Sequence, residues 1–179
     1  GFCTYTEAIY VECMHGYDTA MDYINFKKKR IGNKKNIIGI YGLNREGSGD
    51  MYNKGMLLLN TIRHTIGDDE LWWEIVKGIT TDYAYSIVTS KDIETYINKK
   101  SPSVDLTPIF DQYLRNARIP VLQYKTNKKG RKTTVSYKWD ADIKDFDMPV
   151  MYYDGEGKIQ RLYPTSEKWQ TTTIKKLKP

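Results

Sequence analysis

Histidine and cysteine are scarce in this sequence. Its 179 residues include two histidines, His15 and His64, and two cysteines, Cys3 and Cys13. Neither histidine has a second histidine four residues away or an acidic residue at a recognised ligand spacing, so neither predicts a zinc site. Both are better interpreted as surface or helix-cap histidines. A zinc site built within this chain from His and Cys is therefore not expected.

The two cysteines are also poorly placed for a disulfide. They lie in a segment that predicts a helix, where a rise of ~1.5 Å per residue separates Cys3 from Cys13 by ~15 Å. A disulfide requires Cα atoms within about 7 Å of each other. Both are expected to be free thiols that serve as small buried side chains, and they identify no compartment.

Several recognisable segments and motifs are missing as well. No run approaches the ~18 apolar residues of a membrane-spanning helix, so no membrane segment is expected. The first residues lack the basic region and apolar run of a signal peptide, and the abrupt start is what a piece of a longer protein would show. Gly47-Ser48-Gly49 lacks the context of a nucleophile elbow, and no Walker loop or dinucleotide fingerprint appears.

The residues that are abundant predict a folded core and a basic surface. Hydrophobic residues make up 40% and aromatic residues 13% of the chain, too much for a disordered protein. The net charge is +6, with basic clusters at 27–35 and at Lys125, Lys128, Lys129, Arg131 and Lys132. These clusters fall at a helix end and a hairpin turn, where solvated charge gathers anyway, so no nucleic-acid partner is expected.

Apolar periodicity predicts six short helices in the first 117 residues. Thr4 and Glu7 have capping-box spacing for the first helix, and Gly16 and Gly67 terminate the first and third. Pro108 falls in the first turn of the last helix, where proline is tolerated. The expected helices cover 4–15, 18–31, 51–66, 68–79, 90–99 and 105–114.

The pattern changes near residues 117–120 to alternating segments rich in Val, Thr, Tyr and Trp, which favour strands. Turn signals separate five of them, and such spacing suggests an antiparallel sheet or half of a β-sandwich. The expected strands cover 121–126, 133–139, 148–154, 158–163 and 168–174. The sequence therefore predicts an α+β protein, with an all-helical lobe over 1–118 and a small antiparallel β-sheet or β-sandwich domain over 119–179.

Tyr52 is the candidate catalytic residue. It stands between a glycine-rich loop and an apolar helix, where a phenol held over a cleft can donate a hydrogen bond to a developing oxyanion. Such a donor contributes ~3 kcal/mol in a dry site, and Gly55 would allow close backbone approach. The competing interpretation is an ordinary half-buried packing residue.

Two segments resemble the aminopeptidase N family of zinc metallopeptidases, the gluzincins that include the leukotriene hydrolase. Residues 1–8, Gly-Phe-Cys-Thr-Tyr-Thr-Glu-Ala, are similar to the family stretch Glu-Gly-Phe-Ala-Thr-Tyr-x-Glu. Residues 51–58 contain its Tyr-x-Lys-Gly segment, and 67–73 and 105–114 are similar to its closing helices. The resemblance covers about 1–120 and implies the C-terminal part of a thermolysin-like catalytic domain.

This resemblance implies where the chemistry lies. The family takes two zinc ligands and a general base from a His-Glu-x-x-His helix, and its third ligand is a Glu that would directly precede Gly1. None of these residues is in the sequence, so zinc is expected in the full-length parent and none in this chain. Tyr52 would stabilise the oxyanion, and Thr4 and Tyr5 would lie on the helix that orients the metal site.

The same resemblance implies partners. The parent would hydrolyse N-terminal residues from a peptide substrate, whereas this chain, without the N-terminal catalytic half, is expected to be inactive. Apolar surface is expected around Thr4, Tyr5 and Tyr52, with self-association to cover it. Cys3 departs from the family's usual Ala. The alternatives are a non-catalytic peptide- or protein-binding module and, least favoured, a nucleic-acid binder.

Overall fold

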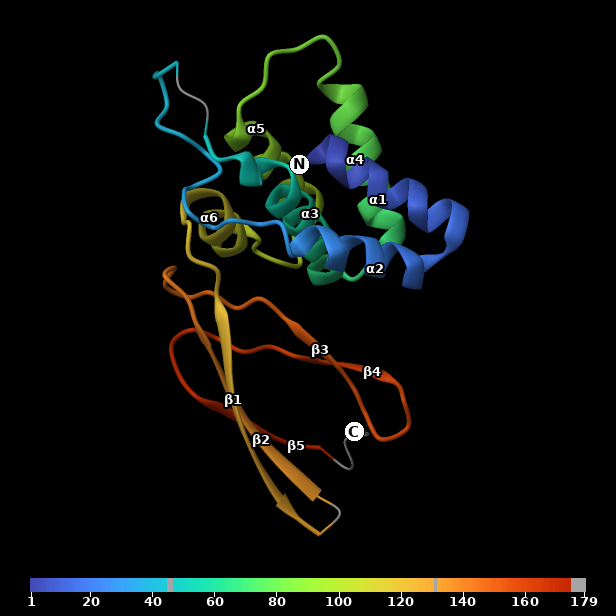
Figure 1. The fold of residues 1–179 in the computed structure, drawn as a ribbon, viewed down its shortest axis with the longest axis vertical. Coiled ribbons are helices and arrows are strands. Elements are labelled where there is room, and N and C mark those ends of the chain that lie inside the picture. Colours follow the sequence, from blue (N-terminus) through green and yellow to red (C-terminus); the bar gives the residue numbers. More distant parts are fainter. Residues whose placement is uncertain (45–46, 131, 175–179) are drawn as a thin grey trace. The chain divides into compact units, whose positions relative to one another are not determined.

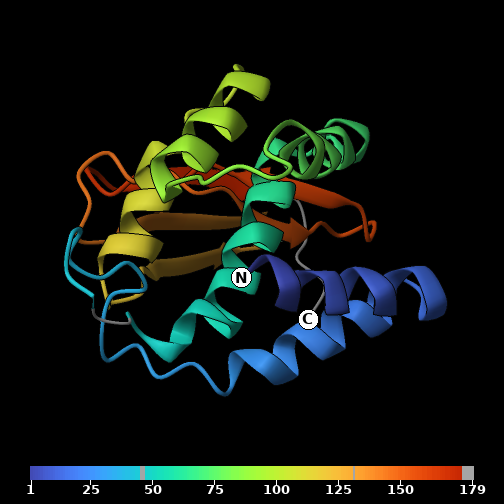
Figure 2. The same cartoon turned by 90° about the horizontal axis from the view of Figure 1, so that it is seen from above.

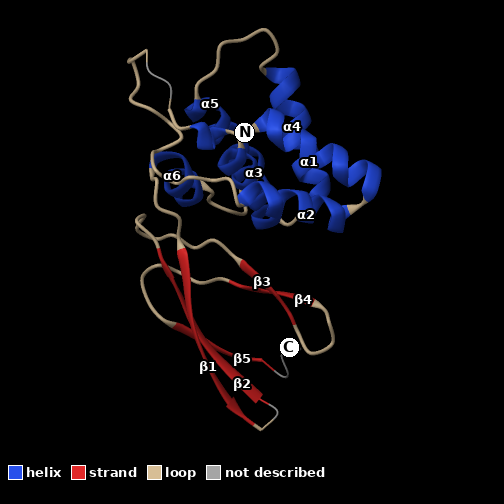
Figure 3. Ribbon diagram, viewed as in Figure 1, coloured by secondary structure: helices blue, strands red, loops and turns tan. Residues whose placement is uncertain are grey.

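The computed structural model describes residues 1–44, 47–130 and 132–174 (Figure 1). Its contacts divide the chain into two compact units, Gly1–Ala117 and Arg118–Pro179. The first unit is helical and the second contains antiparallel strands (Figure 3). The predicted α+β class, a helical lobe followed by a small β domain, is confirmed.

The described part of the helical unit contains six α-helices and one 3₁₀ turn, η1. Contacts with α1, α2, α4 and α6 make α3 the central helix of the unit. The elements are α1 (Phe2–His15), α2 (Tyr17–Lys28), η1 (Gly49–Met51), α3 (Asn53–Ile66), α4 (Asp69–Asp82), α5 (Ser90–Lys100) and α6 (Thr107–Arg115).

The predicted start of the first helix is wrong. Gly1 is the N-cap of α1, and no side chain caps this end, so Thr4 lies inside the helix instead of forming a capping box with Glu7. The predicted stop at Gly16 is confirmed, because this glycine has a φ of 87° and its N–H bonds to the Glu12 carbonyl. Gly16 is also the N-cap of α2, so Asp18 lies in the first turn of that helix and is not its cap.

The second helix is shorter than predicted. It ends at Lys28, and the N–H groups of Lys29, Arg30 and Ile31 each bond to the carbonyl three residues earlier. Such bonds tighten the last turn of a helix into a 3₁₀ turn. The apolar Ile31 therefore follows α2 instead of lying within it.

Helix ends in the rest of the unit follow local rules closely. Gly67 ends α3 in the left-handed conformation, and the Asp68 carboxylate accepts a hydrogen bond from the Leu71 N–H at the start of α4. Helix α5 has its capping box at Thr89 and Asp92 instead of a cap at Ser90. Pro108 lies in the first turn of α6, as predicted.

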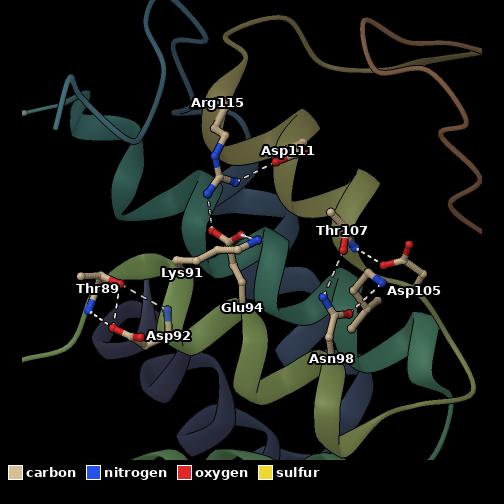
Figure 4. A network of polar contacts seen from close by, with 10 residues as sticks. Thr89, Lys91, Asp92, Glu94, Asn98, Asp105, Thr107, Asp111 and Arg115 are labelled. Atoms are coloured by element: carbon tan, nitrogen blue, oxygen red, sulfur yellow. Dashed lines mark hydrogen bonds and ion pairs between the residues drawn. The ribbon is translucent and has the colours of Figure 1, made fainter.

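A polar network joins α5 to α6 (Figure 4). The Glu94 side chain is 3% exposed and accepts a hydrogen bond of 2.7 Å from the Arg115 guanidinium, which also binds Asp111 at 3.0 Å. The Asn98 side chain accepts a bond from the Leu106 N–H and donates one to Thr107. These contacts fix α6 against α5 and leave the buried Glu94 carboxylate paired.

The β unit contains two small antiparallel sheets in the described residues. The strand order of the first sheet is β1-β2-β5, and β3 and β4 form the second. Val135, Tyr137 and Ile174 of the first sheet pack against Tyr152 and Leu162 of the second, so the sheets face each other across a small core. The strands are β1 (Val121–Lys129), β2 (Lys132–Asp140), β3 (Val150–Tyr153), β4 (Ile159–Leu162) and β5 (Gln170–Ile174).

Candidate functional site

Tyr52 lies at the junction of η1 and α3. It is the N-cap of α3, and its carbonyl accepts the hydrogen bond of the Met56 N–H. The turn before it is held by the Ser48 hydroxyl, which accepts a bond from the Asp50 N–H. The Tyr52 side chain is 55% exposed, so its phenol is available to a ligand at the surface of the helical unit.

The start of α1 packs against the first turn of α3 beside Tyr52. Figure 2 shows the N-terminal end of the chain next to α3. A Cβ added to Gly55 would lie 2.9 Å from the Gly1 Cα, closer than real side chains approach. Two glycines thus allow the backbones to touch, and the two sequence segments that carry the resemblance meet at this contact.

Thr4 and Tyr5 face the interior of the helical unit instead of an open surface. They are 6% and 2% exposed, so the expectation of one exposed apolar face around Thr4, Tyr5 and Tyr52 is wrong. The reason is the packing of α1, whose buried side, formed by Thr4, Tyr5 and Ala8, lies against other helices of the unit. The Tyr5 hydroxyl accepts a hydrogen bond of 3.0 Å from the Trp72 indole N–H, and the two rings meet edge to face.

Burial determines the acid–base state of Tyr5. Removal of the phenol from water raises the pKa of Tyr5 to about 12, although its hydrogen bond with Trp72 and the nearby Arg63 charge act in the opposite direction. Tyr5 therefore remains a neutral hydrogen-bond partner over the physiological pH range. Its described contacts are those of a packing residue that fixes α1 against α4.

Sequence reasoning missed the buried cation that holds this region together. Arg63 is 3% exposed and forms paired hydrogen bonds of 2.6–2.9 Å with both Glu12 and Asp69, and it lies over the Trp73 ring. The hydrogen bonds that Arg63 donates to Asp69 lower the pKa of the Asp69 carboxyl. The one local signal was Asp69, six residues after Arg63 across the Gly67 turn, whereas Glu12 is 51 residues away.

On α1, the exposed apolar surface is formed by other residues. Phe2, Tyr10 and Met14 are 37%, 63% and 60% exposed, and Cys3 and Cys13 are exposed on the same helix. The interpretation of both cysteines as buried side chains is therefore wrong. We call the surface formed by Phe2, Cys3, Tyr10, Cys13 and Met14 the outer face of α1.

An apolar cavity of about 230 Å³ opens beside the Gly1–Gly55 contact. Phe2 and Met51 line it near α1 and η1, and Ile93 lines it from α5. Its floor includes the buried Leu58, Ile97 and Phe110. The cavity is smaller than the 300–1,000 Å³ typical of drug-sized ligand sites and suits a single hydrocarbon side chain.

The described residues do not form a metal site. Within 1–44, 47–130 and 132–174, no group of three or more His, Cys, Asp or Glu side chains lies close enough together to hold a metal ion. His64 lies on α3 with its Nε2 3.2 Å from the Tyr17 hydroxyl. The residues of this chain that the structure describes therefore do not fit a zinc ion on their own.

One lysine of each basic cluster has a described surface contact. The Lys27 ammonium lies 3.2 Å from the Glu7 carboxylate, and that of Lys125 lies 4.9 Å from the centre of the Trp169 ring. Arg131, which the sequence analysis placed in the second cluster, lies outside the described residues. In the part of the chain that the structure describes, no helix is long and apolar enough to cross a membrane.

Comparison with known proteins gives a likeness in fold. No protein-family model matches the sequence, and no curated protein matches it. Among solved structures, the chain is similar to aminopeptidase A from Legionella pneumophila, determined in complex with aspartic acid, with a TM-score of 0.64 and 12% sequence identity. The match covers 98% of this chain and 21% of that chain. The fold of this chain is therefore similar to that of about one fifth of an aminopeptidase.

Proposed function

We propose that this chain is the C-terminal part of the catalytic region of a zinc aminopeptidase of the aminopeptidase N type, which removes N-terminal residues from peptides. The observation that carries the proposal is the contact between Gly1 and Gly55, which joins the two resembling segments. By the resemblance, the third zinc ligand would directly precede Gly1, close to Tyr52. A metal ligand and an oxyanion donor must lie close together to act on one carbonyl group.

The contribution of this chain to the reaction is a positioned phenol. Tyr52 would donate its O–H to the oxygen of the scissile carbonyl as that oxygen gains negative charge. Because the bond strengthens as charge develops, it lowers the barrier more than it tightens substrate binding. Thr4 and Tyr5 would act on this site indirectly, since their burial fixes the helix that begins beside it.

Zinc enters this proposal only through residues outside the chain. The described residues do not fit the ion, so its ligands would have to come from the N-terminal half of the catalytic region. We also propose that the N-terminal half of the catalytic region covers the outer face of α1. In its absence, the chain is expected to self-associate through that face.

A second candidate function is a non-catalytic module that binds peptides or proteins. The apolar cavity beside Gly1 favours it, because it can accept a hydrocarbon side chain without any chemistry. The two candidates differ in what precedes Gly1 in the gene. A His-Glu-x-x-His sequence and a Glu directly before Gly1 would identify an enzyme, and an intact parent without them would identify the binding module.

The biochemical test compares the full-length protein with this chain alone. The full-length protein should contain one equivalent of zinc and cleave an aminoacyl reporter substrate, and the chain alone should do neither. Metal analysis and a fluorogenic assay measure both properties. Hydrolysis by the isolated chain would refute the assignment of the zinc ligands to the missing half. A full-length protein that is inactive and contains no zinc would refute the proposal that it is a zinc aminopeptidase.

A further inference from the structure

Lys54 is a buried cation whose partners are backbone carbonyls. Its side chain is 2% exposed, although it lies in the first turn of α3, two residues after Tyr52. The ammonium donates hydrogen bonds of 3.1 Å to the carbonyl oxygens of Asn116 and Ala117, just beyond the end of α6. Lysine is almost never buried unless it is paired, since burying its charge is costly.

Asp50 is a second buried charge, two residues before Tyr52. Its side chain belongs to η1 and is largely buried. The carboxylate accepts hydrogen bonds of 2.8 Å from the Gly32 N–H and 2.7 Å from the Asn33 N–H. Asp50 thereby ties the turn before Tyr52 to the loop that follows α2.

Together, the two charges secure the backbone on either side of Tyr52. Asp50 holds the turn to residues 32–33, and Lys54 holds the first helical turn to residues 116–117. Burial lowers the pKa of Lys54, and the Asp50 charge acts in the opposite direction. The charged groups of both side chains are buried, so neither can contact a substrate.

We propose that Asp50 and Lys54 are positioning residues that fix the exposed phenol of Tyr52 at the start of α3. The importance of that phenol rests on the proposed function, whereas its fixation does not. A residue that is 55% exposed gains little orientation from packing, so the backbone sets where its Cα–Cβ bond points and which rotamers the phenol can adopt. A purely structural role would stabilise the helical unit without any particular effect on Tyr52.

The test uses this chain with carbon-13-labelled tyrosine and NMR spectroscopy. Lys54→Met keeps an unbranched side chain, one atom shorter, but leaves two carbonyls without their donor, and Asp50→Asn removes one of two acceptor oxygens. Ile75→Val, in the core of α4, is the matched control for a general loss of stability. Thermal melts show which variants are folded and whether the control loses as much stability as the positioning variants.

Positioning predicts a shifted or broadened Tyr52 ring signal in Lys54→Met and in Asp50→Asn. The Met56 N–H, which bonds to the Tyr52 carbonyl, should also exchange at least tenfold faster, and Ile75→Val should leave both properties at wild-type values. Wild-type Tyr52 signals in both positioning variants, with lowered melting temperatures, would overturn the proposal. If Lys54→Met unfolds the chain, Asp50→Asn alone decides.

The full-length protein separates this proposal from the proposed function. There, Lys54→Met should lower kcat on the order of tenfold or more while KM changes little, because a misplaced catalytic group costs rate. If Tyr52→Phe lowers kcat and Lys54→Met does not, the positioning role is overturned and the proposed function stands. If Tyr52→Phe has no effect, the proposed function fails, and the NMR result still decides on positioning.

Discussion

At the scale of single residues, the Tyr5 hydroxyl is the acceptor for the indole N–H of Trp72. Tyr5→Phe should lower the free energy of unfolding by ~1–3 kcal/mol, because it leaves that N–H buried without a partner. Urea denaturation measures the change. Tyr10→Phe on the exposed side of the same helix is the control and should change stability by less than about 0.5 kcal/mol. Equal stability of Tyr5→Phe and wild type would contradict the described hydrogen bond.

The same tyrosine predicts a pH dependence. The folded pKa of Tyr5 is about 12, whereas the ordinary value for tyrosine is near 10. Its stabilisation is therefore fully present below pH ~10 and is lost as the pH rises toward ~12. The stability difference between wild type and Tyr5→Phe should shrink over this alkaline range. A constant difference would show that the phenol titrates alike in the folded and unfolded states.

Gly55 tests the contact that joins the two resembling segments. Gly55→Ala places a methyl group 2.9 Å from the Gly1 Cα, so α1 and α3 must move apart at a cost of ~1–3 kcal/mol. Gly49→Ala is the matched control, because a Cβ there meets no atom within 4 Å. Chemical denaturation of both variants provides the comparison. If Gly55→Ala proves as stable as Gly49→Ala, the start of α1 does not pack against α3 as described.

At the scale of elements, local rules predicted where most helices end but not which of their residues are buried. Gly67 and Asp68 could be predicted because the signals for a helix stop and an N-cap depend on neighbouring residues alone. Thr4 misled the prediction, since a capping-box spacing also occurs by chance inside a helix. Lys54 could not have been predicted to be buried, because its carbonyl partners lie 62 and 63 residues away in the sequence.

The outer face of α1 predicts self-association of the isolated chain. Tyr10 and Met14 present apolar surface on a helix whose opposite side is already buried. Replacing both with lysine should shift the chain toward monomer without unfolding it, as measured by sedimentation at increasing concentration. Thr80→Lys with Thr95→Lys, at exposed positions on α4 and α5, adds the same two positive charges elsewhere and controls for altered surface charge. A wild-type chain that is monomeric at high concentration would contradict this expectation.

At the scale of the whole molecule, the sequence predicted the fold class and the order of helices and strands. Alternation and turn signals were sufficient for five strands, but they could not show that β3 and β4 form a separate sheet, because pairing depends on distant residues. The candidate site was less predictable. Tyr52 could be named from its segment, whereas the burial of Tyr5 depends on a distant partner, Trp72, 67 residues away in the sequence.

The similarity to part of an aminopeptidase concerns the fold, and the proposed chemistry depends on one side chain. The most direct measurement is kcat for an aminoacyl substrate in the full-length protein with Tyr52→Phe, compared with Tyr85→Phe at a fully exposed position outside the outer face of α1. We predict a loss of ~10²-fold or more in kcat for Tyr52→Phe, with zinc content and folding unchanged, and no loss for Tyr85→Phe. An unchanged kcat in Tyr52→Phe would contradict the account.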